Sequence, residues 1–255
     1  MLRVVSHTCS NTEIVCALGC AHMLVAVDSD SDHPPEIVQC LPQLGRDLNL
    51  DVDAVRALTP DLVLTSLTVP GHERIVDALQ AAGLRCLVID PQSLDEVFAS
   101  VHAIAEALGV PERGRALAAQ MDAAMPPRPQ ASDAPRILVE WWPKPVIGAA
   151  RRSWVHDLIE RAGGRNALAA FDAKSATVDT EALAAVAPDA IVMSWCGVRV
   201  EKYRAEVVLG RDGWAQTGAL RARRVYAISE AFLGRPGPRL VEGYRALRCI
   251  VEEAS

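Results

Sequence analysis

The sequence predicts an α/β protein, and two observations support this. Short runs rich in Val, Ile and Leu, each long enough for one strand, alternate with stretches whose apolar residues recur at helical spacing. This alternation is typical of parallel strands covered by helices on both faces. In addition, two segments of the chain match each other, which indicates two lobes of similar fold.

The strand runs are expected at residues 2–6, 24–27, 62–65, 86–89, 137–140, 190–194 and 225–228. Helix starts are marked by capping or acidic residues, namely Ser10 or Asn11 before Glu13, Ser93 before Glu96, and Pro111 before Glu112. A break at residues 109–111 predicts one helix to about residue 108 and a second over 112–125.

The internal match aligns residues 51–66 with residues 179–194 without a gap. Each copy has an acidic first turn, two helical turns, a Pro-Asp break and a strand, although any αβ unit has a broadly similar pattern. The Pro-rich stretch 126–135 is typical of an exposed connection. We therefore predict an N-terminal lobe over residues 1–92, bridging helices and a linker over 93–135, and a C-terminal lobe over 136–255.

Composition excludes several classes of protein. The chain has 255 residues, of which half are hydrophobic, and a formal net charge of −6. An acidic protein without a basic cluster has no electrostatic footprint for nucleic acid. Its longest apolar runs fall far short of the ~20 residues that a spanning helix needs, so membrane insertion is not expected.

The compartment is predicted from the N-terminus and the cysteines. No charged and then apolar leader precedes the first strand run, and the seven cysteines show no CxxC spacing, as expected of buried thiols in a reducing compartment. Both features favour the cytoplasm. If a leader precedes this sequence in the gene, the periplasm or the cell surface is expected instead.

Catalysis is not expected, because the GxGxxG, GxxxxGK[ST], GxSxG and HExxH signatures are all absent. A His, Cys and carboxylate set follows the first two strand runs: His7, Cys9, Asp32 and His33. Its spacing matches no compact metal motif, so packing and capping roles are favoured over a metal site. No metal and no cofactor are predicted. Open α/β sheets bind ligands beyond the carboxyl ends of their strands, and a cleft between the lobes is the expected site.

Aromatic residues are confined to the later part of the chain, since Phe98 is the first of them. Trp141 and Trp142 follow a strand run directly, and adjacent residues of an extended chain point to opposite faces. One ring is therefore expected in the core and the other on the ligand. Trp195 follows another strand run, so a platform for a large flat ligand is predicted, with core packing as the alternative. Trp154 fits either role equally.

A loop rich in glycine and proline, residues 230–239, follows the last strand run. Such loops at strand ends carry functional side chains disproportionately. Phe232 and Arg235 are therefore predicted to reach the ligand.

Several segments, taken in order, resemble the cobalamin (vitamin B12) branch of the helical-backbone substrate-binding proteins. They are residues 3–13, Asp-His-Pro-Pro at 32–35, Gly-Arg-Asp at 45–47, residues 58–63, Trp-Trp-Pro-Lys-Pro at 141–145, Ser-Trp-Cys-Gly at 194–197 and residues 234–239. Proteins of this family serve ABC importers of corrinoids, iron–siderophores and haem. The resemblance spans nearly the whole chain.

The resemblance implies two Rossmann-like lobes bridged by a long helix, with the ligand clamped between them and chemically unchanged. In the family, an acidic residue on each lobe meets arginines of the permease. Asp53 and Glu181 occupy these positions and are equivalent members of the internal match. A charge on each lobe would guide encounter and register. As the alternative, each acid complements a helix dipole only.

Some positions depart from the family pattern. No leader or lipid-anchor cysteine is seen, and the predicted helix over 112–125 reaches only about 21 Å, which is short for a bridging helix. In the cobalamin branch a ligand-contacting tyrosine precedes Asp-Tyr-Pro-Pro; Asp30 stands in its place and His33 replaces the second tyrosine. Cys9 replaces a usual proline.

The leading prediction is a non-enzymatic protein that binds a corrinoid for ABC-type uptake. The predicted ligand contacts are Ser10, Asn11, Asp30, His33, Asp47, Trp141, Trp142, Trp195, Phe232 and Arg235. The aromatic rings would supply apolar contact, and Ser10, Asn11, Asp47 and Arg235 hydrogen bonds to peripheral amides.

Two alternatives stay open. One keeps the fold but changes the ligand to an iron–siderophore or haem, with His7, His33 or Arg235 in contact. The other is a cytoplasmic corrinoid sensor, handling factor or enzyme that uses Cys9, Cys196 or His33 as a nucleophile or metal ligand.

Overall fold

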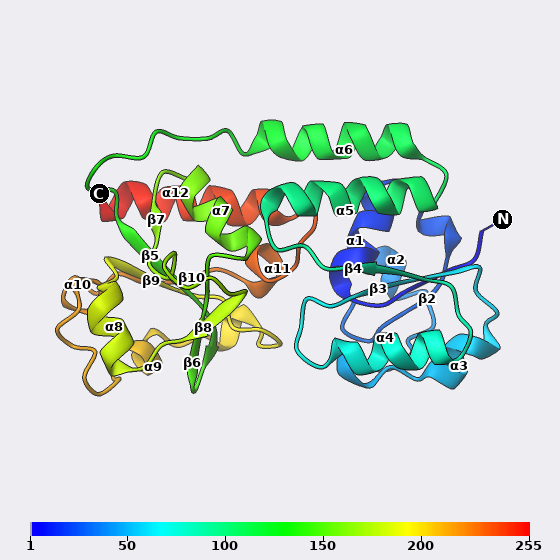
Figure 1. The fold of residues 1–255 in the computed structure, drawn as a ribbon, viewed down its shortest axis with the longest axis horizontal. Coiled ribbons are helices and arrows are strands. Elements are labelled where there is room, and N and C mark those ends of the chain that lie inside the picture. The colour runs from blue at the N-terminus through cyan, green and yellow to red at the C-terminus, as the bar shows by residue number, and fades with distance from the viewer. Residues whose placement is uncertain (1) are drawn as a thin grey trace. The chain divides into compact units, whose positions relative to one another are not determined.

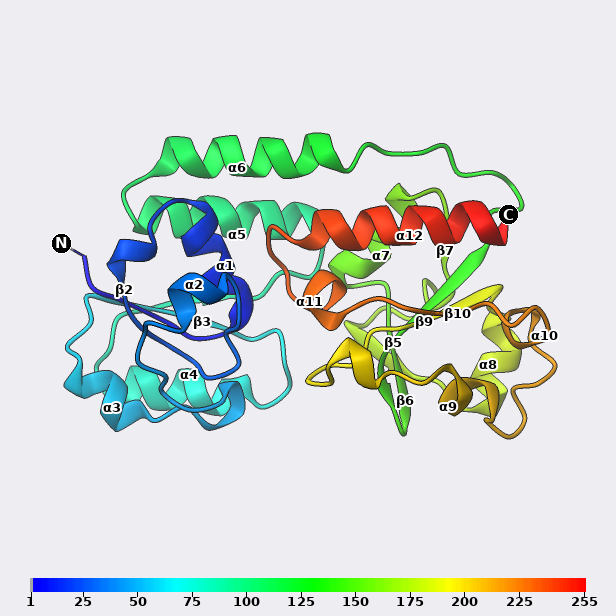
Figure 2. The ribbon, with the colours of Figure 1, turned by 180° about the vertical axis from the view of Figure 1, so that it is seen from behind.

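The computed structural model describes residues 2–255 (Figures 1 and 2). It divides into two compact units. Unit 1 contains the residues up to Pro91 together with Glu96–Gln120, and unit 2 contains Gln92–Asp95 together with Met121–Ser255. The predicted α/β class is confirmed in both units.

Unit 1 is built on a four-stranded parallel sheet in the order β2-β1-β3-β4. Its strands are β1 (Val4–Ser6), β2 (Leu24–Val27), β3 (Leu62–Ser66) and β4 (Cys86–Ile89). Every residue of β1 and β3 is buried, as expected of strands covered on both faces. All four strands lie where the sequence predicts them.

The helices of unit 1 lie on both faces of this sheet (Figure 1). They are α1 (Cys9–Ala17), α2 (Pro35–Val38), α3 (Val52–Ala57) and α4 (His72–Ala81), with 3-10 turns η1 (Ala21–Met23) and η2 (Asp47–Asn49). A core cluster joins the strand residues Val5 and Val63 to Val55 of α3 and Leu79 of α4. The apolar faces of α3 and α4 are thereby buried.

The predicted pair of helices is present as α5 (Leu94–Ala107) and α6 (Pro111–Ala124). They run antiparallel and in close contact, because a Cβ atom at Gly114 would collide with the Cβ of Ala105. The side chain of Arg113 donates to the carbonyl of Leu18, beyond the end of α1, at 3.1 Å. Most of both helices therefore belongs to unit 1, and a separate bridging segment over 93–135 stays a prediction.

The sheet of unit 2 has the order β10-β9-β5-β6-β8, with β7 paired to β5. The strands are β5 (Arg136–Pro143), β6 (Val146–Ala149), β7 (Arg165–Asn166), β8 (Ser175–Thr177), β9 (Ala190–Met193) and β10 (Val225–Ala227). β10, β9, β5 and β7 are parallel, but β6 is antiparallel to both β5 and β8. The expectation of a wholly parallel sheet is wrong here, because β5 turns back into β6 through a short connection at residues 144–145.

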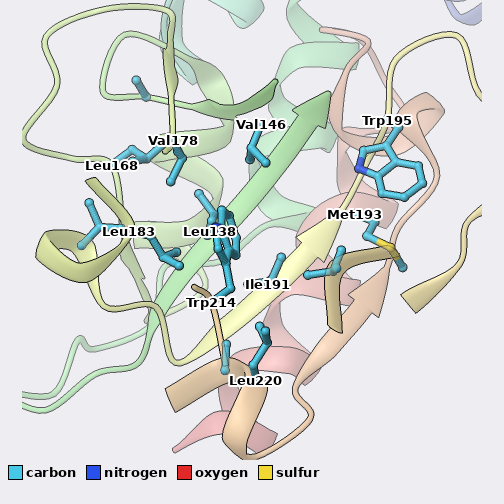
Figure 3. Close-up of a cluster of buried hydrophobic side chains, with 14 of the residues drawn as sticks. Leu138, Val146, Leu168, Val178, Leu183, Ile191, Met193, Trp195, Trp214 and Leu220 are labelled. Carbon is cyan, nitrogen blue, oxygen red and sulfur yellow. The ribbon is translucent and has the colours of Figure 1, made fainter. Parts of the chain in front are cut away.

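The helices of unit 2 also lie on both sides of the sheet. They are α7 (Trp154–Arg161), α8 (Thr180–Val186), α9 (Ala205–Leu209), α10 (Gly218–Arg221), α11 (Glu230–Leu233) and α12 (Leu240–Ala254), with the 3-10 turn η3 (Val200–Lys202). A large apolar core joins Leu138 of β5 and Ile191 of β9 to Leu183 of α8 and Leu220 of α10 (Figure 3).

The internal match of the sequence is confirmed by equivalent hydrogen bonds in the two units. Asp51 caps α3 by accepting from the N–H of Ala54 at 2.9 Å, and Asp179 caps α8 by accepting from the N–H of Ala182 at 2.8 Å. After each helix an aspartate accepts from the backbone N–H of an arginine at the first strand: Asp61 from Arg3 at 2.7 Å, and Asp189 from Arg136 at 2.9 Å. The two units thus share the same cap and the same bond from the aspartate that precedes the next strand.

Two side chains on one face of α7 hold the start of α5 and the end of α6. The carboxylate of Asp157 accepts from the N–H of Leu94, at the start of α5, at 2.6 Å. One helical turn later, Arg161 pairs with the Asp122 carboxylate at 2.5 Å and donates to the carbonyl of Met125, just beyond α6. Both contacts are favourable, because a carboxylate at a helix N-terminus and a guanidinium at a C-terminus each carry the charge opposite to that end of the helix dipole.

The cysteines differ from the expectation of buried thiols. None of the seven forms a disulfide, but only Cys20 is buried, and Cys40, Cys196 and Cys249 are exposed. No helix within residues 2–255 combines the length and apolar character that crossing a membrane demands.

Candidate functional site

The carboxyl edge of the unit 1 sheet carries a buried polar network. Asp28, directly after β2, is fully buried and burial raises its pKa. Its carboxylate accepts from the N–H groups of Thr8 at 2.9 Å, Asp30 at 2.9 Å and Ser31 at 3.0 Å, and from the Ser31 hydroxyl at 2.7 Å. This one side chain therefore joins the turn after β1 to the turn after β2.

Two of the predicted ligand contacts, Asp30 and Asp47, are brought together at this edge. The Asp30 carboxylate accepts from the N–H of Asp47 at 3.0 Å and pairs with Arg46 at 3.1 Å. The thiol of Cys9 donates to the carbonyl of Asp30 at 2.9 Å. The side chains of Asp30 and Asp47 stay 30% and 28% exposed, so their remaining acceptor positions face solvent.

Two buried imidazoles, those of His7 and His72, contact Asp47. His7 Nε2 donates to the Asp47 carbonyl at 2.7 Å, and in the neutral ring Nδ1 then accepts from the Thr65 hydroxyl at 2.7 Å. His72 Nε2 lies 3.4 Å from the Asp47 carboxylate, and its Nδ1 lies 3.2 Å from Ser66 Oγ. The two rings meet edge to face at 5.1 Å.

These contacts set the charge states. Burial lowers the pKa of His7 to about 4, so the ring is neutral at pH 7. The hydrogen bond from His72 is the main cause that lowers the pKa of Asp47. Sequence reasoning missed His72, because a histidine after a glycine carries no pattern that indicates burial.

The predicted contacts at the start of α1 are less accessible. Ser10 is 5% exposed and Asn11 is fully buried. The Asn11 amide donates to the carbonyl of His7 at 3.0 Å, which leaves its Oδ1 buried without a partner among residues 2–255. His33 is half-buried in the turn before α2.

In unit 2 the structure distinguishes the two adjacent tryptophans. Trp142 is 44% exposed, and its Nε1 donates to the Lys144 carbonyl at 3.0 Å, which fixes the ring. Trp141 packs at 6.1 Å from the ring of Trp154, and its Nε1 is buried without a partner in the described chain. The two rings therefore differ in exposure, with Trp142 exposed and Trp141 half-buried, and a ligand contact by either ring stays a prediction.

Trp195 lies at the end of β9 in the apolar core of unit 2, only 5% exposed (Figure 3). Its Nε1 donates to the carboxylate of Glu140 at 3.3 Å, and its ring lies 5.1 Å from that of Tyr203. Here the alternative of core packing describes its surroundings. A ligand contact by Trp195 stays a prediction.

Glu140 and Arg211 form a buried ion pair that sequence reasoning missed. Glu140 is fully buried at the point where β5 leaves the core, and Arg211 donates to both of its carboxylate oxygens, with Nη2 at 2.9 Å from Oε2. The guanidinium also lies 4.7 Å from the ring centre of Trp214. Glu140 lies within β5, whereas His7 directly follows β1, and both side chains are fully buried.

The expectation of a continuous loop over residues 230–239 is wrong at its start, because the side chain of Ser229 caps a short helix, α11, that contains Phe232; Arg235 follows this helix. Phe232 is half-buried on α11, and the guanidinium of Arg239 lies 5.7 Å from its ring centre. Arg235 pairs with Glu230 at 2.8 Å, and both side chains are largely buried. Its positive charge is thus balanced within the loop.

The predicted permease contacts are both exposed. Asp53 lies in the first turn of α3, where it pairs with Arg56 at 3.2 Å, and Glu181 lies in the first turn of α8. Within residues 2–255, no three His, Cys, Asp or Glu side chains are grouped as a metal site requires. His7 and Cys9 instead make the hydrogen bonds described above.

Known proteins resemble this chain over nearly its full length. The chain is 29% identical to the uncharacterized ABC transporter substrate-binding lipoprotein YvrC of Bacillus subtilis, over 96% of this chain and 78% of the relative. It is 26% identical to a vitamin B12-binding protein of Vibrio cholerae, over 94% and 85%.

Solved structures share the fold. The haem-binding protein RhuT from Roseiflexus sp. RS-1 superposes with a TM-score of 0.81 at 29% identity, covering 99% of this chain and 98% of that one. The vitamin B12-binding protein BtuF of Vibrio cholerae gives 0.74 at 23% identity, covering 99% and 97%. The model of the family described as periplasmic binding protein matches residues 4–231. The chain therefore belongs to the periplasmic binding protein family, as a substrate-binding protein of ABC importers.

Proposed function

We propose that this protein binds an amidated corrinoid, such as cobalamin, and presents it unchanged to an ABC permease. The observation that carries the proposal is the acceptor-rich edge of unit 1, where the half-buried carboxylate of Asp30 accepts from the backbone N–H of Asp47, whose own carboxylate is also partly exposed. Carboxylates only accept hydrogen bonds when ionised, and the peripheral carboxamides of a corrinoid are N–H donors.

The negative charge of Asp47 favours a ligand with neutral carboxamides, such as a corrinoid, over an anionic ligand. The hydrogen bond from His72 lowers the pKa of Asp47, so this carboxylate is ionised at neutral pH, and Arg46 at 3.1 Å offsets the charge of Asp30. Haem propionates and acidic siderophores would bring further negative charge to this edge, which costs interaction energy. Neutral carboxamides bring none.

Aromatic side chains of unit 2 supply the apolar contact. Trp142 offers a large exposed ring whose orientation is fixed by its bond to the Lys144 carbonyl, so little entropy is lost when a flat ligand covers it. Phe232 is a second, half-buried ring. The relatives named as vitamin B12-binding proteins support the same ligand.

Haem is the second candidate, favoured by the similarity to haem-binding structures at 28–29% identity. Haem iron needs an axial ligand from the protein. The Tyr203 hydroxyl donates to the Trp195 carbonyl at 3.0 Å, that of Tyr244 donates to the Pro126 carbonyl, and that of Tyr226 is buried. His33 is then the axial ligand to test. An iron–siderophore, whose iron is already coordinated, is the further variant of this candidate.

Asp53 and Glu181 are proposed as the contacts with permease arginines. They occupy equivalent places in the two units, each is exposed, and each helix is capped by a different aspartate. Capping does not depend on Asp53 or Glu181, and Asp53 pairs with the exposed Arg56 on its own helix, at 3.2 Å, so a permease arginine could compete for its charge. This role requires the protein to act outside the cytoplasm. Cell fractionation tests it, and a cytoplasmic pool would favour a sensor or handling factor.

The ligand is tested with the purified protein and its Asp30→Asn/Asp47→Asn variant, titrated with cyanocobalamin and with haemin. An amide in place of a carboxylate weakens charge-assisted hydrogen bonds, so the variant should bind cyanocobalamin about tenfold to hundredfold more weakly. Its affinity for haemin should not fall. Asp77→Asn, on the exposed face of α4, is the control. Wild-type protein that binds haemin but not cyanocobalamin would overturn the corrinoid proposal.

A further inference from the structure

Thr8 adopts a backbone conformation that a threonine rarely takes. It lies between β1 and α1 with φ 84° and ψ 139°, in a region that glycine adopts freely and a β-branched residue does not. Thr59, Ala187 and Arg223 also have positive φ, between 38° and 55°. The φ of Thr8 is larger than that of any of these three residues, and its ψ is extended.

The carboxylate of Asp28 holds this conformation. Its Oδ2 accepts from the N–H of Thr8 at 2.9 Å, and the same carboxylate fixes the N–H groups of Asp30 and Ser31. Asp28 is fully buried. A second link runs through Thr12, whose hydroxyl lies 2.9 Å from Ser6 Oγ and 2.9 Å from Ser31 Oγ.

The buried Asp28 carboxylate and the positive φ of Thr8 each lower the stability of the folded chain. A buried carboxylate and a left-handed threonine are each unfavourable, and one hydrogen bond joins them. What they jointly fix is the direction of the chain into Ser10 and Asn11 on one side and into Asp30 on the other. Strain of this kind persists where the surrounding structure over-determines the backbone, and it clusters at functional sites.

We propose that Asp28 is a positioning residue for ligand binding: by holding the N–H of Thr8, it keeps the start of α1 and the Asp30 turn in the orientation that receives the ligand. This inference rests on the proposed function for its ligand, but its geometry is a property of unit 1 alone. Asp28 itself has all its oxygens engaged by protein groups and does not contact the ligand.

A rescue experiment separates positioning from a merely structural role. Asp28→Asn removes one of the two anionic oxygens, and we expect cyanocobalamin to bind about tenfold more weakly. Thr8→Gly adopts a positive φ without strain, so this substitution in the Asp28→Asn background should restore affinity to within about threefold of the wild type. Thr8→Gly alone should leave affinity unchanged. Asp51→Asn, another carboxylate that accepts a backbone N–H in unit 1, is the matched control and should have no effect.

Hydrogen exchange provides a readout that needs no ligand. The N–H of Thr8 should exchange at least about tenfold faster in Asp28→Asn than in the wild type, whereas the N–H of Val63, bonded within the sheet at 2.8 Å, should not change. Wild-type protein that fails to bind cyanocobalamin would overturn the proposed function, and the exchange rates would still decide the role of Asp28. Unchanged exchange at Thr8, or a double variant that binds no better than Asp28→Asn, would overturn the inference.

Discussion

The imidazole of His7 donates to the backbone carbonyl of Asp47 at 2.7 Å, across 40 residues of sequence. His7 is fully buried, and burial lowers its pKa to about 4. The neutral ring of His7 therefore holds the Asp47 backbone in place, and protonation of this ring lowers the free energy of unfolding.

Low pH should reduce the free energy of unfolding through the titration of His7. Above pH 6.5 the ring is neutral in both the folded and the unfolded chain, so its titration has no effect on stability. As the pH falls from 6.5 to 4, the unfolded chain binds a proton that the folded chain does not, and the free energy of unfolding should fall by about 3 kcal/mol. Urea unfolding of wild type and His7→Gln at pH 7, 5.5 and 4.5 measures this. Parallel pH profiles for the two proteins would contradict it.

Reversing the charges of Asp53 and Glu181 should separate transport from ligand binding. In Asp53→Arg/Glu181→Arg, we expect ligand affinity to stay within about twofold, because both side chains are exposed on helix first turns. Repulsion from permease arginines should reduce ligand-stimulated ATP hydrolysis by the reconstituted permease about tenfold or more.

The matched control is Glu73→Arg/Glu206→Arg, which reverses first-turn acids on α4 and α9. Both double variants lose a favourable helix-dipole interaction of about 0.3–1 kcal/mol per site. If the control reduces ATP hydrolysis as much as the test variant, the acids at positions 53 and 181 have only this local role.

Gly243 of α12 allows close approach of α11. A Cβ atom at this position would collide with the carbonyl oxygen of Phe232 and with the Leu233 side chain. Alanine in a helix is ordinarily more stable than glycine, but here Gly243→Ala should lower the free energy of unfolding by about 1–3 kcal/mol. Denaturant unfolding checks this, with Arg245→Ala on the exposed side of α12 as the control. A stabilised Gly243→Ala protein would show that α11 moves away without cost.

Arg161 should contribute to the stability of unit 2 through the carbonyls at the end of α6. Arg161→Leu leaves the Met125 carbonyl and the Asp122 carboxylate without this donor, and we expect a loss of about 1–3 kcal/mol. The control is Arg152→Leu, since the exposed Arg152 side chain forms a surface pair with Asp172 at 3.6 Å. Equal effects of the two substitutions would exclude a special role for Arg161.

The sequence predicts well what depends on local pattern. Apolar runs locate β2 and β4 to the residue, and the matched Asp51 and Asp179 correctly indicate two helices with equivalent caps. The place of Asp30 at the carboxyl edge of the sheet is predictable because it follows β2, whereas Asp47 lies in η2, and no strand end indicates that its N–H meets the Asp30 carboxylate.

Long-range polar contacts escape sequence reasoning. Arg211 reaches the buried Glu140 across 71 residues, and His72 reaches Asp47 across 25. A charged residue next to an apolar run is compatible with a strand end whether its side chain is exposed or buried. The local sequence therefore predicts neither of these two contacts. The antiparallel β6 was missed for a related reason: its four residues follow two prolines and are typical of a loop as much as of a strand.

The ligand is the central question, and isothermal titration of the wild-type protein with cyanocobalamin answers it most directly. We predict saturable binding of one cyanocobalamin per chain, with a parallel loss of tryptophan fluorescence as the ligand covers Trp142. No heat and no fluorescence change at tens of micromolar cyanocobalamin, together with saturable binding of haemin, would contradict corrinoid recognition.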